Sequence, residues 1–143
     1  MVQFHQSYSY EDFIIGYRPT KGGFDLSKGP FYEFCKEAED NREHAHYFII
    51  DEINHGNLSK IFGELLILIE NDKRGEKLRL LYENELFSVP PNVYLIGLMN
   101  TADRSLAMID YALRRRFAFF ETGMPSSKAD FTNSYKLRGG HPC

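Results

Sequence analysis

The amino-acid sequence predicts an α/β domain with a mostly parallel sheet and flanking helices. Two short apolar runs, residues 47–50 and 93–99, contain aromatic and β-branched side chains without polar alternation, which is typical of strands covered on both faces. Between them, residues 57–70 carry apolar side chains at three- and four-residue spacings, the period of a helix. Both runs end in polar clusters, at the position where open α/β sheets bind their ligands.

The composition is that of an ordinary globular protein. The chain has 143 residues, 43% hydrophobic and 26% charged, which excludes disordered and collagen-like classes. A net charge of −3 gives no general basic footprint for nucleic acid. The two cysteines show neither paired nor metal-ligand spacing, and no apolar run is long enough to span a bilayer. We therefore expect a cytoplasmic protein with reduced thiols and no membrane partner.

The first forty residues predict short elements around a loop. Residues 2–5 resemble a strand, and residues 7–13 supply hydroxyl and acidic side chains that can cap a helical turn. Gly16 and Pro19 then act as breakers, and residues 20–30 carry the glycines of an exposed connection or a hairpin. Apolar residues from Phe31 to Ala38 recur at helical spacing, which predicts an amphipathic helix leading into the first apolar run.

The remaining elements follow the same alternation. The predicted elements, in order, are a helix over 57–70, a hairpin over 78–82 and 86–89, a strand over 93–99, a helix over 106–113 and a third strand over 117–121. The tail that follows is rich in Gly, Ser, Thr, Asn and Lys. We therefore expect one domain over residues 1–122 and a flexible tail over residues 123–143.

Candidate catalytic residues follow the first apolar run. An Asp at a strand end can hold Mg²⁺, and the adjacent Glu can polarise a water, so Asp51 and Glu52 fit the division of labour in nucleotide-hydrolysing sheets. Asn100 and Asp103 follow the second run, and parallel strands would bring both clusters to one edge. Alternatives remain open: the acids can cap the next helix, and Asn100 can bond its own turn.

Three consecutive arginines, Arg114 to Arg116, close the predicted helix over 106–113. Cations at a helix C-terminus are favoured by the helix dipole, so one of them needs no further role. Three in a row exceed what capping requires, which indicates a function for at least one.

Four segments together resemble the AAA+ domain of McrB-type methylcytosine restriction GTPases, from about residue 2 to about residue 121. They are Ser7–Phe13, Ile50–Asn54, Met99–Ser105 and Ala112–Phe117. The resemblance implies that Asp51 and Glu52 are the Walker B pair and that Asn100 is the sensor 1 residue, with Asn54 beside it near the attacking water. It also implies nucleotide contact by Asp103 and an arginine finger at Arg115 or Arg116.

The resemblance further implies the setting of such a domain. Its nucleotide would be GTP rather than ATP, held with Mg²⁺. The intact protein would form a homo-oligomeric, hexameric ring, would work with a McrC-type nuclease subunit, and would read DNA through a separate domain that this chain does not contain.

The sequence departs from the family pattern in one respect. No Gly-x-x-x-x-Gly-Lys-Ser/Thr motif occurs in the 143 residues, so the Walker A phosphate loop is missing. We expect a truncated motor domain that lacks the first core strand, this loop and the helical lid. Two further hypotheses remain: a non-hydrolytic interaction subunit or degenerate fragment that contributes ring contacts, and an ATP-using AAA+ protein.

Overall fold

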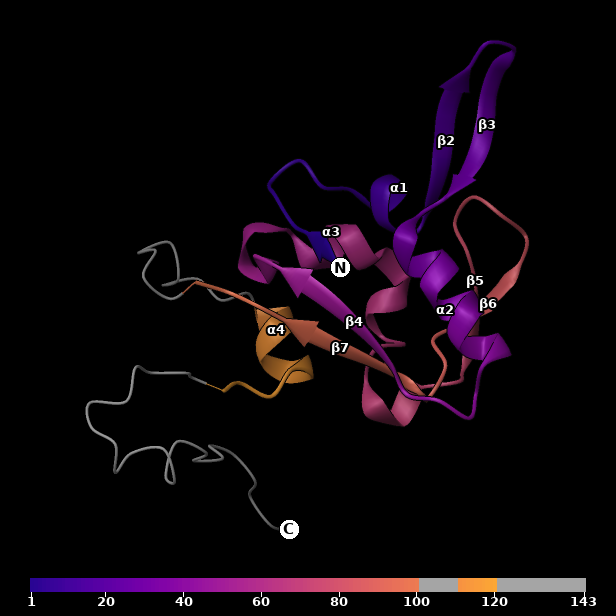
Figure 1. The fold of residues 1–143 in the computed structure, drawn as a ribbon. Helices are drawn as coiled ribbons and strands as arrows, with labels where there is room; N and C mark the ends of the chain where they lie inside the picture. Colours follow the sequence, from indigo (N-terminus) through magenta and orange to yellow (C-terminus); the bar gives the residue numbers. More distant parts are fainter. Residues whose placement is uncertain (101–110, 121–143) are drawn as a thin grey trace, which may run out of the picture.

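A computed structural model describes residues 1–100 and 111–120 (Figure 1). Its central element is a three-stranded sheet in the order β1, β4 and β7, formed by Val2–Gln3, His46–Asp51 and Val93–Gly97. All strands of this sheet run parallel, with Val2 opposite Ile50 and Ile50 opposite Gly97. The expected α/β domain with a parallel sheet is therefore confirmed.

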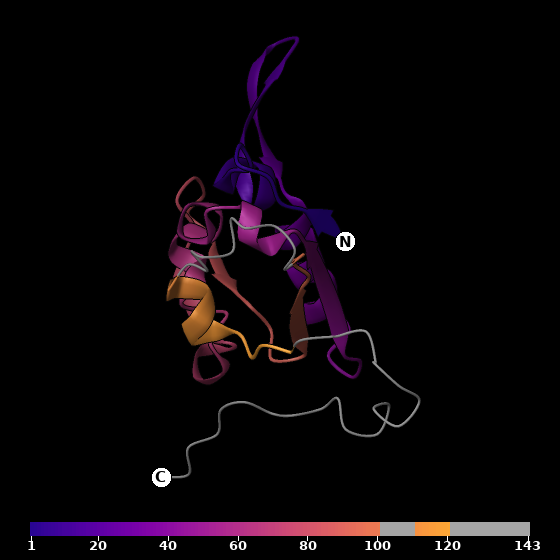
Figure 2. The ribbon, with the colours of Figure 1, turned by 90° about the vertical axis from the view of Figure 1, so that its left-hand side faces the viewer.

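The prediction that these strands are covered on both faces is wrong. Burial alternates along β4: Phe48 and Ile50 are buried, whereas Tyr47 is 60% exposed. In β7, Tyr94 is 51% exposed on the same face. The reason is visible in Figures 1 and 2, where the described helices lie on one side of the sheet and leave the other side uncovered.

The core lies between the sheet and two helices, α2 (Pro30–Asp40) and α3 (Leu58–Phe62). Its centre is a group of aromatic rings around the fully buried Phe13. The Phe13 ring stacks on Phe31 at 5.0 Å and meets Phe62 edge-on at 5.0 Å and Phe48 at 5.7 Å. Such pairs add roughly 0.5–1.5 kcal/mol each beyond the burial of their area. This cluster fixes β4 against the helices.

A two-stranded ribbon projects from this core (Figure 1). Ser9 caps the short helix α1 (Tyr10–Phe13) in a capping box with Asp12, as the hydroxyl and acidic residues predicted. The chain then forms β2 (Ile15–Thr20) and β3 (Gly23–Lys28), which pair antiparallel. Gly16 and Pro19, expected as breakers after the helical turn, lie beyond the end of α1 and inside β2, because a two-stranded ribbon tolerates proline at its edge.

The predicted helix over 57–70 is interrupted. Asn57 caps α3 by accepting a hydrogen bond from the Lys60 amide, but the α-helix ends after Phe62. Gly63 adopts φ 53° and ψ −130°, a backbone conformation that a helix cannot contain. The chain continues as short 3₁₀ turns, η2 (Gly63–Leu66) and η3 (Asn71–Lys73). Leu65, Leu68 and Ile69 are nevertheless buried, so the apolar spacing marks core residues.

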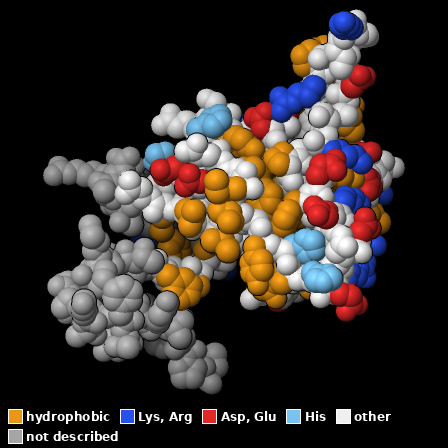
Figure 3. All heavy atoms as spheres, in the orientation of Figure 1, with side chains coloured by type: hydrophobic (Ala, Val, Ile, Leu, Met, Phe, Trp, Pro, Cys, Tyr) orange, Lys and Arg blue, Asp and Glu red, His pale blue; other side chains and the backbone are white. Residues whose placement is uncertain are grey.

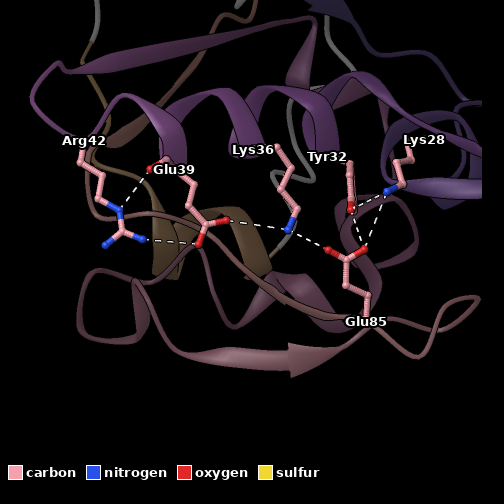
Figure 4. Close-up of polar contacts among 6 residues, drawn as sticks. All are labelled: Lys28, Tyr32, Lys36, Glu39, Arg42 and Glu85. Carbon is pink, nitrogen blue, oxygen red and sulfur yellow. Dashed lines mark hydrogen bonds and ion pairs between the residues drawn. The ribbon is translucent and has the colours of Figure 1, made fainter.

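The predicted hairpin is confirmed as β5 (Lys77–Arg79) and β6 (Leu86–Ser88). Its connecting loop is fastened to α2 by Glu85 (Figure 4). The Glu85 carboxylate accepts hydrogen bonds from the Tyr32 hydroxyl at 2.7 Å and pairs with the Lys36 ammonium at 2.8 Å. Hydrogen bonds from Lys36 and Tyr32 lower the pKa of Glu85 to about 2.

Residues 111–120 are the C-terminal segment that the structure describes. Helix α4 (Tyr111–Arg116) ends with the three arginines, as predicted. The expected strand over 117–121 does not form over residues 117–120, because these residues pair with none of the described strands. The start of the expected helix, Asp103 and the tail over 123–143 lie outside the described residues. None of the helices in the described part of the chain is long and apolar enough to cross a membrane.

Candidate functional site at the strand ends

Asp51 is the last residue of β4 and lies where the strand turns away from the sheet. Its backbone carbonyl accepts a hydrogen bond from the Phe4 amide at 2.9 Å, which extends the pairing with β1 to the strand's end. Its side-chain Oδ1 accepts a hydrogen bond from the Glu52 amide at 3.0 Å. This bond orients the carboxylate at the carboxyl edge of the sheet.

Glu52 holds an unusual backbone conformation. Its φ of 51° and ψ of 43° lie in the left-handed region, and it is the one non-glycine with positive φ in the described chain. That conformation costs an L-residue roughly 1–2 kcal/mol. Strained residues of this kind cluster at functional sites, where the surrounding fold enforces them.

Two buried oxygen atoms in this turn lack hydrogen bonds from any described residue. They are Oε2 of Glu52 and Oδ1 of Asn54, which lies in the 3₁₀ turn η1 (Ile53–His55). The imidazole Nε2 of His55 is 3.8 Å from Glu52 Oε2, beyond hydrogen-bond distance. An unpaired buried acceptor costs roughly 1–3 kcal/mol, so both atoms would be stabilised by a donor or a cation.

The oxygen atoms of this turn fit the preference of Mg²⁺, which binds carboxylates together with water and substrate phosphates. Asp51 and Glu52 supply carboxylates and Asn54 an amide oxygen. Among the described residues, no cluster of three His, Cys, Asp or Glu side chains surrounds a metal position. Magnesium sites that use nucleotide phosphates need only one or two protein carboxylates.

The end of β7 runs beside this turn. The amide of Leu98 donates to the Ile50 carbonyl at 2.8 Å, and the Leu98 carbonyl accepts from the Ile53 amide at 3.0 Å. Leu98 therefore bonds to the chain on both sides of Asp51 and Glu52. Asn100, two residues further on, is exposed and leaves the sheet at the same edge. The sequence-based expectation that the two strand ends meet agrees with these bonds.

Gly97 makes this close approach possible. A Cβ atom at Gly97 would lie 2.7 Å from Cδ1 of Ile53, closer than real contacts allow. The absence of a side chain lets the 3₁₀ turn with Asn54 pack directly on β7. Sequence reasoning missed Gly97. A glycine inside an apolar run was the available signal for it, since such a glycine indicates close backbone packing.

The two candidate finger residues have different surroundings. Arg116 donates from Nε to the Leu66 carbonyl at 3.0 Å and pairs through Nη2 with Glu70 Oε1 at 2.7 Å, and its side chain is 17% exposed. Arg115 is exposed and lines a hollow of about 260 Å³ that also contains Asp72. Arg116 therefore fastens α4 to the 3₁₀ turns of its own chain, whereas Arg115 is more exposed. Asp103 lies outside the described residues.

A parallel α/β sheet whose strand ends carry this acidic turn defines the class of P-loop NTPase-like domains. The family described as the AAA domain, dynein-related subfamily, matches residues 1–117 of the chain. The chain belongs to this family, and it is a partial AAA domain of the McrB type.

Two curated relatives are components of restriction enzymes. The chain is 62% identical over 126 residues to the type IV methyl-directed restriction enzyme EcoKMcrB subunit of Escherichia coli K12, covering 85% of this chain and 28% of that protein. It is 30% identical over 158 residues to the type II restriction enzyme BsuMI component YdiS of Bacillus subtilis 168, covering 82% of this chain and 46% of that protein. The chain therefore spans less than half the length of either relative.

Proposed function

We propose that this domain is the catalytic centre of a GTP-hydrolysing AAA+ motor in a modification-dependent DNA restriction system. The observation that carries the proposal is the strained turn at the end of β4, where Glu52 presents a buried carboxylate oxygen without a hydrogen bond from the described chain. Membership of the AAA family supports the binding of a nucleotide, and similarity to a methyl-directed restriction subunit supports a role in DNA restriction.

Each residue of the turn has one task in this proposal. Asp51, fixed by the Glu52 amide, holds Mg²⁺ directly or through water. Glu52 accepts a hydrogen bond from the attacking water and polarises it toward the γ-phosphate. Asn54 and Asn100 bond the same water or the γ-phosphate from either side, and Asp103 contributes to nucleotide contact. The metal, when bound, neutralises charge that develops on the phosphates.

Arg115 is the arginine finger in this proposal, and Arg116 is its structural support. A finger acts on a neighbouring subunit's nucleotide and must therefore be exposed, as Arg115 is. Arg116 is held by Leu66 and Glu70 within its own chain. A finger in trans requires a homo-oligomeric ring, and the relatives' names as subunit and component support further partners, here a McrC-type nuclease and a separate DNA-reading domain. We place the assembly in the cytoplasm.

The decisive experiment uses a protein that contains this domain together with a phosphate-binding loop. Glu52→Gln keeps the size of the side chain but removes its charge, so nucleotide binding should persist while GTP turnover falls about a hundredfold or more. Arg115→Ala should also bind nucleotide yet lose about a thousandfold in turnover. Arg116→Ala is the matched control. It should lower the stability of the fold, while the turnover of the protein that remains folded should fall much less than in Arg115→Ala.

Mixing the two inactive variants separates cis from trans action. An interface between an intact Glu52 site and an intact Arg115 neighbour would be complete, so mixed rings should regain part of the activity that neither variant shows alone. Absence of recovery at every ratio, with subunit exchange confirmed by fluorescence, would contradict an arginine finger at Arg115. Parallel assays with GTP and ATP distinguish the proposed GTPase from an ATP-using relative.

A non-hydrolytic interaction subunit is the second candidate. The observation that favours it is that Arg115 is exposed, so it can reach the nucleotide of a partner subunit whether or not its own subunit hydrolyses nucleotide. This candidate requires that Glu52→Gln changes no activity of the assembly, whereas Arg115→Ala lowers the turnover of intact partner subunits.

A further inference from the structure

Helix α4 is held in place by polar bonds at its last residue. Arg116 donates from Nε to the Leu66 carbonyl at 3.0 Å and pairs through Nη2 with Glu70 Oε1 at 2.7 Å. The helix lies on the packed side of the sheet, near the segment that follows α3 (Figure 2). The hydrophobic side chains over β4 and β7 in Figure 3 belong to the opposite side of the sheet. The position of α4 therefore depends on its bonds to residues 66–70.

Glu70 is itself held by its backbone. Its amide donates to the Ile67 carbonyl at 3.2 Å, and its carbonyl accepts from the Lys73 amide at 3.0 Å. The side chains of Glu70 and Arg116 are 34% and 17% exposed, so their ion pair is partly shielded from water. A charged hydrogen bond of this kind, between partners that are held by other bonds, fixes a geometry better than a pair of mobile surface chains.

Arg74 fastens the same turn to the sheet. It donates from Nε to the Ile69 carbonyl and from Nη1 to the Val93 carbonyl, at 3.1 Å in each case. Ile69 directly precedes Glu70, and Val93 is the first residue of β7. One connection therefore runs from β7 through Arg74 to the turn, and a second runs from Glu70 through Arg116 to α4.

The proposed arginine finger, Arg115, lies next to the anchored residue. It lines a hollow of about 260 Å³ together with Glu70, Asp72 and Arg116. A catalytic group contributes fully only in the correct place, and a misplacement of about 1 Å can cost roughly a hundredfold in rate. The helix that carries a finger must therefore be fixed by another element of its own subunit.

We propose that Glu70 is a positioning residue for the arginine finger. By pairing with Arg116, it sets the place of α4 from which Arg115 reaches the nucleotide of the neighbouring subunit. This inference rests on the proposed function of Arg115. Glu70 acts through Arg116 and not by contact with the nucleotide, and Arg74 makes β7 the reference against which the finger is placed.

The first test is kinetic and uses a protein that contains this domain together with a phosphate-binding loop. Glu70→Ala should lower kcat for GTP about tenfold and leave KM within about twofold, because the finger acts in the transition state. Adding Glu70→Ala to Arg116→Ala should cause no further loss, since Glu70 acts through Arg116. A raised KM with unchanged kcat, or multiplying losses in the double variant, overturns the proposal.

Glu76→Gln is the matched control. It removes a carboxylate from the same segment, and Glu76 pairs with Lys73 on the surface instead of with α4. We expect it to retain full turnover. A loss of turnover equal to that of Glu70→Ala would show that the charge of the segment matters rather than the bond to Arg116.

The second test mixes variants and separates positioning from general stability. A residue that only stabilised the fold would also damage its own subunit's active site, whereas a positioning residue affects only the finger. Mixed with Glu52→Gln, Glu70→Ala should therefore turn over GTP several-fold faster than the mean of the two separate proteins, because its intact site meets an intact finger. Mixed with Arg115→Ala, it should show no gain.

The outcomes of mixing also distinguish this inference from the proposed function. If Arg115→Ala gains activity from Glu52→Gln but Glu70→Ala does not, Glu70 has no positioning role, and the finger at Arg115 stands. If neither variant gains activity, with subunit exchange confirmed by fluorescence, the finger itself is refuted, and the role of Glu70 falls with it.

Discussion

Glu52 combines two unfavourable features at one position. Its backbone is left-handed, and one of its carboxylate oxygens is buried without a hydrogen bond from the described residues. Each feature lowers the stability of the fold, and neither is needed to end a strand. Such local costs are retained where chemistry requires the geometry, which makes Glu52 the residue at which stability and activity should oppose each other.

Replacing Glu52 by glycine should therefore stabilise the chain. Glycine adopts the left-handed region without the Cβ penalty, and the substitution also removes the unpaired oxygen, so we expect a gain of about 1 kcal/mol in unfolding free energy. Urea denaturation measures it. Glu52→Ala is the control, since it removes the carboxylate but keeps the backbone strain. Equal stabilities of the glycine and alanine variants would show that the backbone is not strained.

The two neighbouring arginines should differ in their effects on folding. Arg116→Ala removes a bond to the Leu66 carbonyl and an ion pair with Glu70, so the unfolding free energy should fall by about 2 kcal/mol. Arg115→Ala alters an exposed side chain on the same helix and should change it by less than about 0.5 kcal/mol. Thermal melts of both variants compare them directly, and equal losses would contradict the assignment of Arg116 as the anchor.

Polar contacts of tyrosine attach the segment between β5 and β6 to the rest of the domain. The Tyr82 hydroxyl donates to Glu11 at 2.7 Å, and the Tyr10 hydroxyl donates to Glu64, which also accepts from the Leu81 amide. Glu85 continues this pattern with Tyr32 on α2. Because Lys28 at the end of β3 donates to the Tyr32 hydroxyl, both antiparallel hairpins are anchored at one point of α2.

This anchor should depend on pH through Glu85. Its pKa is lowered to about 2 from an ordinary 4.5, so its contribution is present above about pH 4.5 and is lost as the pH falls toward 2. Glu85→Gln should lower the unfolding free energy by about 1 kcal/mol at pH 7, since the pair is partly exposed, and the difference should shrink in acid. Urea melts between pH 7 and pH 3 measure it.

Glu76→Gln is the control for this pH dependence. Glu76 pairs with Lys73 at 3.2 Å on the surface, and its side chain is 56% exposed. Solvent screens such a pair, so the substitution should have little effect on stability. A Glu85→Gln effect that stays the same from pH 7 to pH 3 would contradict the ion-paired carboxylate.

The described molecule is a half-covered sheet. The packed side contains the aromatic cluster around Phe13 and the helices, and the other side exposes β4 and β7 (Figure 2). Parallel sheets are normally covered on both faces, and this uncovered face is the largest departure from that rule in the described residues.

The chain alone should hydrolyse neither GTP nor ATP. The backbone amides and lysine of a Gly-x-x-x-x-Gly-Lys-Ser/Thr loop hold the β- and γ-phosphates in this class, and the 143 residues contain no such loop. Steady-state phosphate release by the parent chain should equal that of a Glu52→Gln control. Release clearly above the control with either nucleotide would refute this prediction.

Much of the fold was predictable because its signals are local. The Ser9 cap, the helix from Pro30 to Asp40 and the hairpin before β7 follow from capping chemistry and hydrophobic period. Predictions failed where a neighbour decides the outcome. Residues 117–120 have strand-like composition but form no strand, because pairing requires a second strand. Helix α3 ends at Gly63, although the apolar spacing over residues 57–70 favours a longer helix.

The sequence by itself determined the α/β class, the family and the candidate acidic residues at the strand end, because these depend on side-chain period and on motifs of adjacent residues. Only the tertiary structure decided which oxygens are buried without a hydrogen bond, that Arg116 anchors α4 while Arg115 is exposed, and that the described residues leave one side of the sheet uncovered. Burial and edge pairing arise from contacts between residues far apart in the chain, which no local pattern contains.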